Sequence, residues 1–381
     1  MNSKYEISTK ENREFLKASC EELLNFGHRF PSPNGGSYYL GDDGTPWKDR
    51  NRETWITCRM AHVYSLGLML GHEGSEELAD AALKGLKGEL HDEKNGGWYA
   101  GVTPEGDIVP NKQCYAHAFV ILAASSALTA GRPGAKELLE EALAVYDRHF
   151  WNEEEGLACD TWNTEFTVLD DYRGLNANMH TVEAFLAAGD VTGDKKYHIR
   201  AGRIIDHVIQ WAEDNSWRIP EHFTKEWVAD LDCNRDRPDD PFKPYGATPG
   251  HGIEWARLIT QWTLANCGEE KEKLEIHLQA AENLYTTAIK DGWNADGAPG
   301  IVYTTDWNGK PVVHDRMHWT LAEAINTSAV LYQVTGKEKY AKDYAAFMKY
   351  LDEVVMDHEN GSWFHQLDEQ NHLKGTVWPG K

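Results

Sequence analysis

The sequence has no apolar run long enough to cross a membrane. Its longest such stretch extends from Ala118 to Ala124, whereas a membrane-spanning helix needs about 20 residues. The first dozen residues are polar and partly acidic, so they do not form a secretory signal. We therefore expect a cytoplasmic protein that has no membrane partner.

Basic residues are scarce in this chain. Lys and Arg number 38 against 61 Asp and Glu, which gives the 381 residues a formal net charge of −23. A field of that sign repels phosphate backbones. Nucleic acid is therefore not an expected partner, and the charge also disfavours anionic substrates.

Cysteine pairs and cofactor motifs are missing as well. The six cysteines are scattered without a C-x-x-C pair, which is typical of reduced thiols in the cytoplasm. The sequence contains no G-x-G-x-x-G, Walker loop, G-x-S-x-G or H-E-x-x-H motif. We expect no cofactor.

Aromatic residues, in contrast, are abundant. The chain has 15 Trp, 16 Tyr and 11 Phe, although its mean hydropathy is only −0.60. Many Trp residues stand beside Asp, Asn, His or Gly. Flat rings next to polar groups suit a sugar, but large helical cores also use Trp, so both interpretations stay open.

A helix pair recurs along the chain at steps of about 60 to 70 residues. Five similar polar and aromatic segments each lead into an apolar helix; they begin at Thr54, Gln113, Asn176, Thr248 and Arg316. Charged amphipathic helices follow, among them Glu137–Phe150, Lys195–Trp211, Lys271–Ile289 and Glu338–Val355. With a first helix near Glu6–Phe26, the pattern predicts eleven helices.

The connections alternate between short turns and long loops. Gly193-Asp194 and Gly336-Lys337 are short, whereas the long loops are Glu93–Asn111, Trp151–Gly174, Ser216–Pro249, Gly292–Asp315 and Asp357–Lys381. This predicts one all-α domain over residues 1–381, an (α/α)6 toroid with apolar inner helices and the long loops at one mouth. A sixth inner helix would fall beyond Lys381, so either the toroid is open or that helix is absent from this sequence. The alternative fold is an α-solenoid scaffold.

The segment from Tyr245 to Trp255 is the strongest candidate for chemistry. Thr248 and Pro249 suit the N-cap and first position of a helix, which puts His251 in its first turn. Glu254 then lies on the same face. The helix dipole favours a neutral imidazole that can relay a proton. The alternative is a core histidine bonded to a backbone carbonyl.

His180 and Glu183 repeat this spacing on another inner helix. Such pairs occur in carboxylate-bridged metal sites, but there the usual order is Glu-x-x-His and further glutamates bridge the ions. Neither feature is evident in this sequence, so we do not expect a metal.

Two further inner-helix features each have two interpretations. Arg59 needs an acceptor, which is either a carboxylate such as Glu254 or Glu323, or a substrate oxygen. Trp319 lies one turn before Glu323, so its ring either stacks on a sugar beside that carboxylate or only packs in the core.

The last long loop contains G-S-W-F-H-Q-L-D at residues 361–368. The alternation of Trp363, His365 and Leu367 predicts a short extended run with one inward face. His365 together with His251 at the same mouth would form a two-histidine proton-transfer site.

Several of these segments resemble the N-acylglucosamine 2-epimerase superfamily, and in particular its aldose–ketose isomerase branch, which includes mannose and sulfoquinovose isomerases. The resemblance covers the chain from about Thr54 onward. It depends on W-I-T-C-R-M, N-A-N-M-H-T-V-E-A, P-Y-G-A-T-P-G-H-G-I-E-W-A-R-L, H-W-T-L-A-E-A and G-S-W-F-H-Q-L-D.

The resemblance implies an (α/α)6 barrel that isomerises a sugar through a cis-enediol without metal. His365 matches the base that moves the proton between C2 and C1, and His251 matches the acid and base of ring opening. The sugar-binding and supporting positions match Arg59, Asn176, His180, Glu254, Trp319 and Glu323. A base with a pKa near neutrality suits this proton transfer.

The sequence departs from the family in two places, and the first of them bears on the expected substrate. Asp239 and Asp240 precede P-Y-G, where sulfoquinovose isomerases have basic residues, so we expect neutral mannose to be converted to fructose. Family members also continue past W-P-G-K into a closing helix. A monosaccharide is thus the expected partner, and a homo-oligomer stays open. The alternatives are a 2-epimerase acting on mannose or on a cellobiose-type disaccharide, a sulfoquinovose isomerase, a glycoside hydrolase using Asp170/Asp171 or Glu254/Glu323, and a helical scaffold without catalysis.

Overall fold

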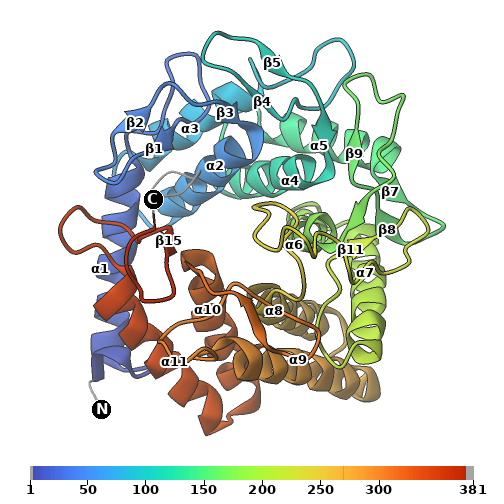
Figure 1. The fold of residues 1–381 in the computed structure, drawn as a ribbon. Coiled ribbons are helices and arrows are strands. Elements are labelled where there is room, and N and C mark those ends of the chain that lie inside the picture. Colours follow the sequence, from blue (N-terminus) through green and yellow to red (C-terminus); the bar gives the residue numbers. More distant parts are fainter. Residues whose placement is uncertain (1–2, 269, 375–381) are drawn as a thin grey trace. The chain divides into compact units, whose positions relative to one another are not determined.

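The computed structural model describes residues 3–268 and 270–374, which form two compact units. Unit 1 comprises residues 1–23 and 205–381, and unit 2 comprises residues 24–204. Across the described residues there are eleven α-helices, as the repeat predicts, and only short strands (Figure 1).

The helices alternate along the chain between apolar helices and charged ones. Their bounds are α1 (Lys10–Gly27), α2 (Thr54–Met69), α3 (Ser75–Leu86), α4 (Cys114–Thr129), α5 (Ala135–His149), α6 (Leu175–Thr192), α7 (Lys195–Asp214), α8 (Pro249–Asn266), α9 (Lys271–Gly292), α10 (His318–Thr335) and α11 (Glu338–Tyr350). The boundary between the units falls within α1 and within α7.

In unit 2 the apolar helices pack on one another and the charged helices cover them. Helix α4 contacts both α2 and α6, while α3 packs on α2 and α5 packs on α4 (Figure 1). Every residue of α4 from Ala116 to Ala127 is buried. Helix α5 instead buries one stripe, which includes Leu138, Leu139 and Ala142. The predicted alternation of the two helix types is therefore confirmed in this unit.

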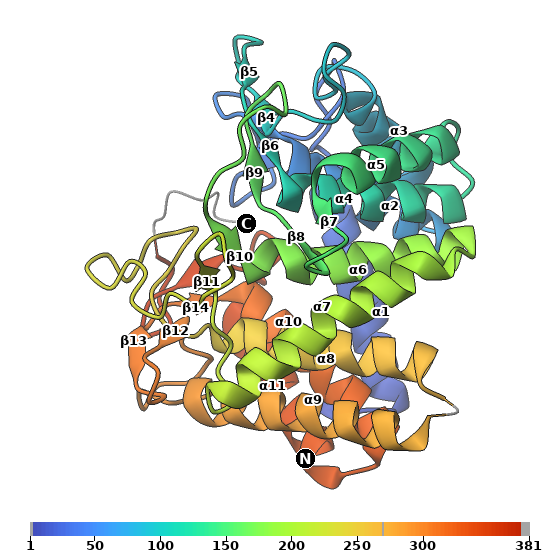
Figure 2. The same ribbon diagram turned by 90° about the vertical axis from the view of Figure 1, so that its right-hand side faces the viewer.

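Unit 1 repeats the arrangement. Helix α8 contacts α9 and α10, and α10 contacts α11 (Figure 2). Within α8 thirteen of the eighteen residues are buried, whereas α11 buries mainly aromatic side chains on one side. Two predicted bounds change: α1 begins at Lys10 rather than near Glu6, and the last charged helix ends at Tyr350, where a π-helical turn continues to Val355.

The connections alternate as predicted. Gly193 and Gly336 end α6 and α10 in the left-handed conformation, which glycine adopts without steric cost. The long loops contain all the strands of the described residues. In unit 2 these are β1 (Tyr39–Leu40), β2 (Pro46–Trp47), β3 (Arg52–Glu53), β4 (Gly101–Val102), β5 (Ile108–Val109), β6 (Lys112–Gln113), β7 (Trp151–Asn152), β8 (Leu157–Ala158), β9 (Thr161–Trp162) and β10 (Arg173–Gly174).

Unit 1 contributes β11 (His222–Phe223), β12 (Thr304–Thr305), β13 (Pro311–Val313), β14 (Arg316–Met317) and β15 (Gln366–Leu367). Strands β14 and β15 pair antiparallel, so the loop after α11 returns to the start of α10. The end of that loop and the W-P-G-K segment, residues 375–381, lie outside the described residues.

Two further findings bear on the predictions from composition. All six cysteines are free thiols. Of the helices in residues 3–268 and 270–374, none is long and apolar enough to cross a membrane.

Candidate functional site

Helix α8 begins where the sequence predicts, but one detail of its cap differs. Thr248 is the N-cap and Pro249 the first helical residue. The Thr248 hydroxyl, however, is buried and has no hydrogen-bond partner among the described residues. The chain that leads into α8 is held instead by its backbone, because Ala247 exchanges two hydrogen bonds of 2.9 Å with Thr305. Gly246 permits this approach, since a Cβ there would lie 2.1 Å from the Thr305 carbonyl oxygen.

His251 lies in the first turn of α8 and is paired with a buried carboxylate. Its Nδ1 lies 2.9 Å from Oε1 of Glu221. Burial alone would lower the pKa of His251, but the charges of Glu221, Glu254 and Glu323 outweigh it, and the pKa is raised. The helix-dipole argument therefore predicted the wrong direction, because the carboxylates near His251 favour its charged form more strongly than burial disfavours it.

Trp319 of α10 packs directly on the start of α8. Its ring centroid lies 5.1 Å from that of His251, with the planes 34° apart. Gly250 makes room for the indole, because a Cβ at this position would lie 2.6 Å from the Trp319 ring. Tyr303 contacts the same indole edge to face at 6.3 Å. Trp319 is therefore held beside His251 from two sides.

The carboxylates of Glu254 and Glu323 share one arginine. Arg257 donates to both oxygens of Glu323 at 2.8 and 3.1 Å. It also lies 3.7 Å from Glu254. All three side chains are largely buried, so the pairing satisfies charges that would otherwise be costly. The sequence argument considered these carboxylates as acceptors for Arg59 and did not consider Arg257.

His365 lies immediately before β15 and is held against the first residue of α10. The backbone N–H and the Nδ1 of His318 both lie 3.1 Å from the His365 carbonyl oxygen. The two imidazole rings are 4.8 Å apart. Burial, with a contribution from His318, lowers the pKa of His365 to about 3. His365 is therefore a neutral imidazole at physiological pH.

The two candidate catalytic histidines consequently lie at the same helix end in unit 1. His251 contacts Trp319, His365 contacts His318, and the two contacted residues are consecutive in the first turn of α10. The predicted extended run around His365 is also found: Trp363 pairs with Met356, and β15 follows. The surroundings stabilise the charged form of His251 and the neutral form of His365.

The remaining predicted residues, Arg59, Asn176 and His180, lie in unit 2. Arg59 of α2 is exposed; it donates to the Tyr115 hydroxyl at 3.2 Å and lies over the ring of Phe119 at 4.4 Å. His180 of α6 contacts both of these α4 rings, at 5.1 and 4.7 Å. Arg59 and His180 thus belong to one aromatic cluster, which we define by Arg59, Tyr115, Phe119 and His180.

Asn176 and Glu183 lie on α6 with His180. Asn176, in the first turn, is exposed. Nδ1 of His180 lies 3.2 Å from Glu183, so the predicted pair is in contact. Within the part of the chain that the structure describes, no group of three or more His, Cys, Asp or Glu is arranged to hold a metal ion.

Sequence reasoning missed four residues: Glu221, Arg257, His318 and Tyr115. Glu221 precedes His251 by 30 positions in a long loop, where no periodic pattern could indicate the contact. His318 and Tyr115 had a visible signal, because both stand in the repeated openings of apolar helices. Other residues of these openings were named as candidates, but His318 and Tyr115 were not.

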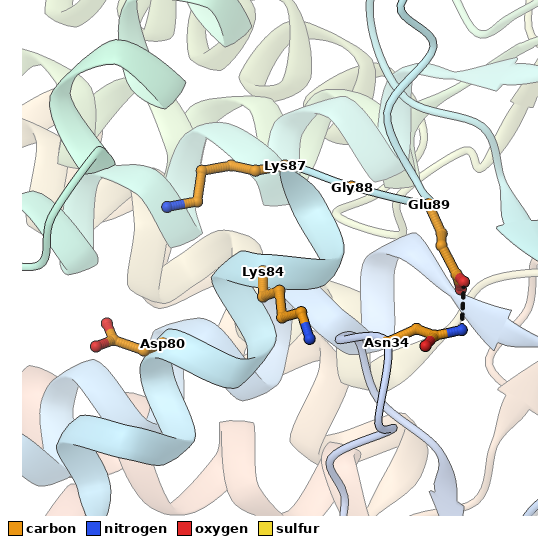
Figure 3. A pocket seen from close by; sticks show the side chains of 6 residues that line it. All are labelled: Asn34, Asp80, Lys84, Lys87, Gly88 and Glu89. Atoms are coloured by element: carbon orange, nitrogen blue, oxygen red, sulfur yellow. Dashed lines mark hydrogen bonds between the residues drawn. The ribbon is translucent and has the colours of Figure 1, made fainter.

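A separate surface pocket of about 460 Å³ lies on unit 2 beside α3 (Figure 3). Its charged groups already have partners: Glu89 accepts from Asn34 at 2.6 Å, the amines of Lys84 and Lys87 donate to backbone carbonyls, and Asp80 pairs with Arg132. No aromatic ring is among its six lining residues, which are Asn34, Asp80, Lys84, Lys87, Gly88 and Glu89. We assign no function to this pocket.

Comparison with known proteins defines the class to which this chain belongs. A crystal structure of a D-mannose isomerase matches it with a TM-score of 0.89 and 28% identity, over 98% of this chain and 95% of the other. The protein is therefore an all-α protein of the α/α-toroid class.

The sequence identifies the family. The profile of N-acylglucosamine 2-epimerase (GlcNAc 2-epimerase) matches residues 35–381, and the chain belongs to this family. A D-mannose isomerase of Thermobifida fusca is 40% identical over 97% of this chain and 91% of its own length. A cellobiose 2-epimerase of Ruminococcus albus is 24% identical over 97% of this chain and 94% of its own. The resemblance inferred from the motifs is thus confirmed.

Proposed function

We propose that the protein is an aldose–ketose isomerase that interconverts D-mannose and D-fructose through a cis-enediol, without metal or cofactor. The observation that carries the proposal is the pair of unlike histidines, His251 and His365, at the start of α10. Relatives named D-mannose isomerase, at 40% identity over nearly the whole chain, support an isomerase.

The chemistry needs a base that is uncharged at neutral pH. After the ring opens, His365 takes the proton from C2 of the aldose, and the electron pair of that bond forms the C1–C2 double bond while O1 gains a proton. The proton on His365 then returns to C1 as O2 loses its own proton to give the ketose carbonyl. Burial holds the pKa of His365 at about 3, so its imidazole is neutral over the physiological range. This pKa lies below the near-neutral value expected from the sequence, and it makes the imidazole a weaker base than a histidine with an ordinary pKa.

The sugar-binding roles that the resemblance implies follow from residue chemistry. Trp319 beside His251 offers a flat apolar face, and Glu254 and Glu323 are carboxylates that accept from hydroxyls. Arg59 and His180 of unit 2 are polar groups next to aromatic rings, which is the combination that suits a hexose, and Asn176 is an exposed amide on the same helix as His180. These assignments are part of the proposal.

A neutral sugar fits the charge of the molecule better than an anionic one. The net charge of −23 and the acidic Asp239 and Asp240 oppose a sulfonated or phosphorylated sugar. We further propose a single domain in the cytoplasm, consistent with six free thiols.

Hydrogen exchange in heavy water tests the role of His365. With mannose, the unaltered protein should form fructose and incorporate deuterium at C1 and C2, as observed by proton NMR without added metal. His365→Ala should lose at least 100-fold of this activity, because general acid–base catalysis contributes about 10²- to 10⁴-fold.

His372→Ala is the matched control, since this histidine lies in the same loop with its side chain 77% exposed. It should exchange like the unaltered protein. Full deuterium incorporation by His365→Ala would contradict the assignment.

A sugar 2-epimerase is the second candidate, favoured by the cellobiose 2-epimerase relative. Product analysis separates the two reactions: a dominant ketose identifies an isomerase, and a dominant C2-epimeric aldose identifies an epimerase. A glycoside hydrolase is disfavoured by the geometry of its candidate carboxylates. Glu254 and Glu323 both face Arg257, and Asp171 is exposed, whereas a hydrolase needs a carboxylic acid and a carboxylate flanking the bond.

A further inference from the structure

Glu221 is a buried carboxylate that the sequence did not single out. It stands in the segment from Ile219 to Phe223, all of whose residues are buried, and only 5% of its side chain is exposed. Such a carboxylate is costly unless it is paired and hydrogen-bonded. The partner that the structure provides is the imidazole of His251, at 2.9 Å.

This contact determines which nitrogen of His251 can exchange a proton. An ionised carboxylate only accepts hydrogen bonds, so Nδ1 of His251 carries a hydrogen that it donates to Glu221. Nε2 is then the nitrogen that gives and takes a proton. A carboxylate behind an imidazole in this way also stabilises the imidazolium form.

Two other carboxylates near His251 have a weaker effect on it than Glu221. Glu254 lies one turn along α8, and Glu323 lies on α10, which packs against α8. Both face Arg257, which also lies on α8 and offsets part of their charge. Glu221 is the carboxylate in direct contact with the ring, so it is the main source of stabilisation for the charged imidazole.

We propose that Glu221 is a positioning residue that holds His251 as an imidazolium, with Nε2–H as the proton donor for opening the sugar ring. The inference rests on the proposed function, because it names the group that prepares His251 for that reaction. In the step itself, the C1–O5 bond breaks, O5 takes the proton from Nε2, and the hydroxyl at C1 loses its proton to solvent and becomes the aldehyde. Ring closure in the ketose returns a proton to the neutral imidazole.

The first test is a direct titration of His251, independent of activity. The protein is labelled with ¹³C and ¹⁵N in histidine, and the His251 signals are assigned with the variant His251→Gln. In the unaltered protein the midpoint should lie above 6.5, and Glu221→Gln should lower it by at least one pH unit, a tenfold change in proton affinity. Glu221→Asp keeps the charge at a longer distance and should fall between the two.

Glu226→Gln is the matched control, because this glutamate lies in the same loop, is exposed, and its replacement changes the net charge equally. It should leave the midpoint of His251 unchanged. An equal midpoint in Glu221→Gln and the unaltered protein would overturn the proposal. If Glu221→Gln does not fold, the midpoint of Glu221→Asp decides, and no shift in that variant overturns it.

The second test is the pH profile of kcat/KM for mannose. The basic limb of this profile should follow the titration midpoint of His251, so it should move to lower pH in Glu221→Gln. Near pH 7.5, kcat of this variant should fall about 10- to 100-fold, which is within the usual contribution of acid–base catalysis. A purely structural role of Glu221 would lower activity without moving the limb, and that result also overturns the proposal. Failure of the proposed function looks different, because His365→Ala would then retain exchange whatever the midpoint of His251.

Discussion

Histidine environments in this chain show how burial and neighbouring groups together determine a protonation state. His251 meets a carboxylate, and its pKa rises. Burial, with a contribution from the neighbouring His318, lowers the pKa of His365. His117, on α4, is fully buried: its Nδ1 donates to the Gln113 carbonyl, and its Nε2 accepts from the backbone N–H of Trp98. Each ring is fixed in one form before any substrate binds.

His117 leads to a prediction about acid stability. Burial, partly offset by the bond to Gln113, lowers its pKa to about 3. A proton on Nε2 would also face the N–H of Trp98. A depressed pKa means that this contribution to stability is present above pH 6.5 and is lost as the pH falls toward 3. Between pH 6.5 and 4.5 the loss from this group is about 3 kcal/mol at most.

Urea unfolding at pH 7 and pH 5 measures this effect. His117→Gln should be less stable than the unaltered protein at pH 7 but should lose less of its stability at pH 5. His28→Gln, which replaces an exposed histidine of the same unit, should keep the original pH dependence. An unchanged pH dependence in His117→Gln would show that other groups govern the acid transition.

At the scale of elements, the contact between the first turns of α8 and α10 positions the chemistry. Gly250 lets these turns approach, and the β14–β15 pair brings the loop of His365 to the same place. Neither helix end is positioned by a side-chain cap: backbone hydrogen bonds to Thr305 and to His365 hold them instead. Small changes of packing here should therefore affect both activity and stability.

Gly250→Ala tests that expectation. The added methyl group would lie 2.6 Å from the Trp319 ring and 2.7 Å from Thr320, so the indole must move away from His251. We expect a loss of about 1–3 kcal/mol in unfolding free energy, typical of an overpacked contact, and a fall in kcat of at least tenfold. Thermal unfolding and steady-state kinetics with mannose measure the two effects.

Gly268→Ala is the control, because a Cβ there meets no atom within 4 Å. If Gly250→Ala were as active as this control, Trp319 would have no part in positioning the reaction.

The elements were easier to predict than the contacts between them. Helix positions follow from local patterns: the apolar run of α4 and the stripe of α5 are visible in the sequence itself. His251 and His365 could be named because they stand in distinctive segments. Glu221 could not, because its contact with His251 joins a loop and a helix 30 residues apart. The direction predicted for the pKa of His251 was wrong for the same reason, since this pKa depends on carboxylates from three different segments.

At the scale of the whole molecule, charge should select among substrates. Screening shortens the reach of the protein's field from about 30 Å at 0.01 M salt to about 10 Å at 0.1 M. The net charge of −23 repels an anionic sugar but not mannose. KM for mannose should therefore be the same at low and high salt.

The comparison needs two sugars and one salt series. KM for mannose is measured from 10 to 300 mM sodium chloride beside that for a phosphorylated or sulfonated hexose. The anionic sugar should be a poorer substrate, and its KM should fall as salt increases. A several-fold dependence of the mannose KM on salt, or an anionic sugar preferred at low salt, would contradict a neutral substrate.

Consecutive placement of His318 and Trp319 also has a practical consequence. The first turn of α10 contacts both the proton donor and the proton acceptor, so it fixes their positions relative to each other. Efforts to alter sugar preference by redesigning distant loop residues can then proceed without disturbing the catalytic register. Insertions within that single turn would separate the two imidazoles at once.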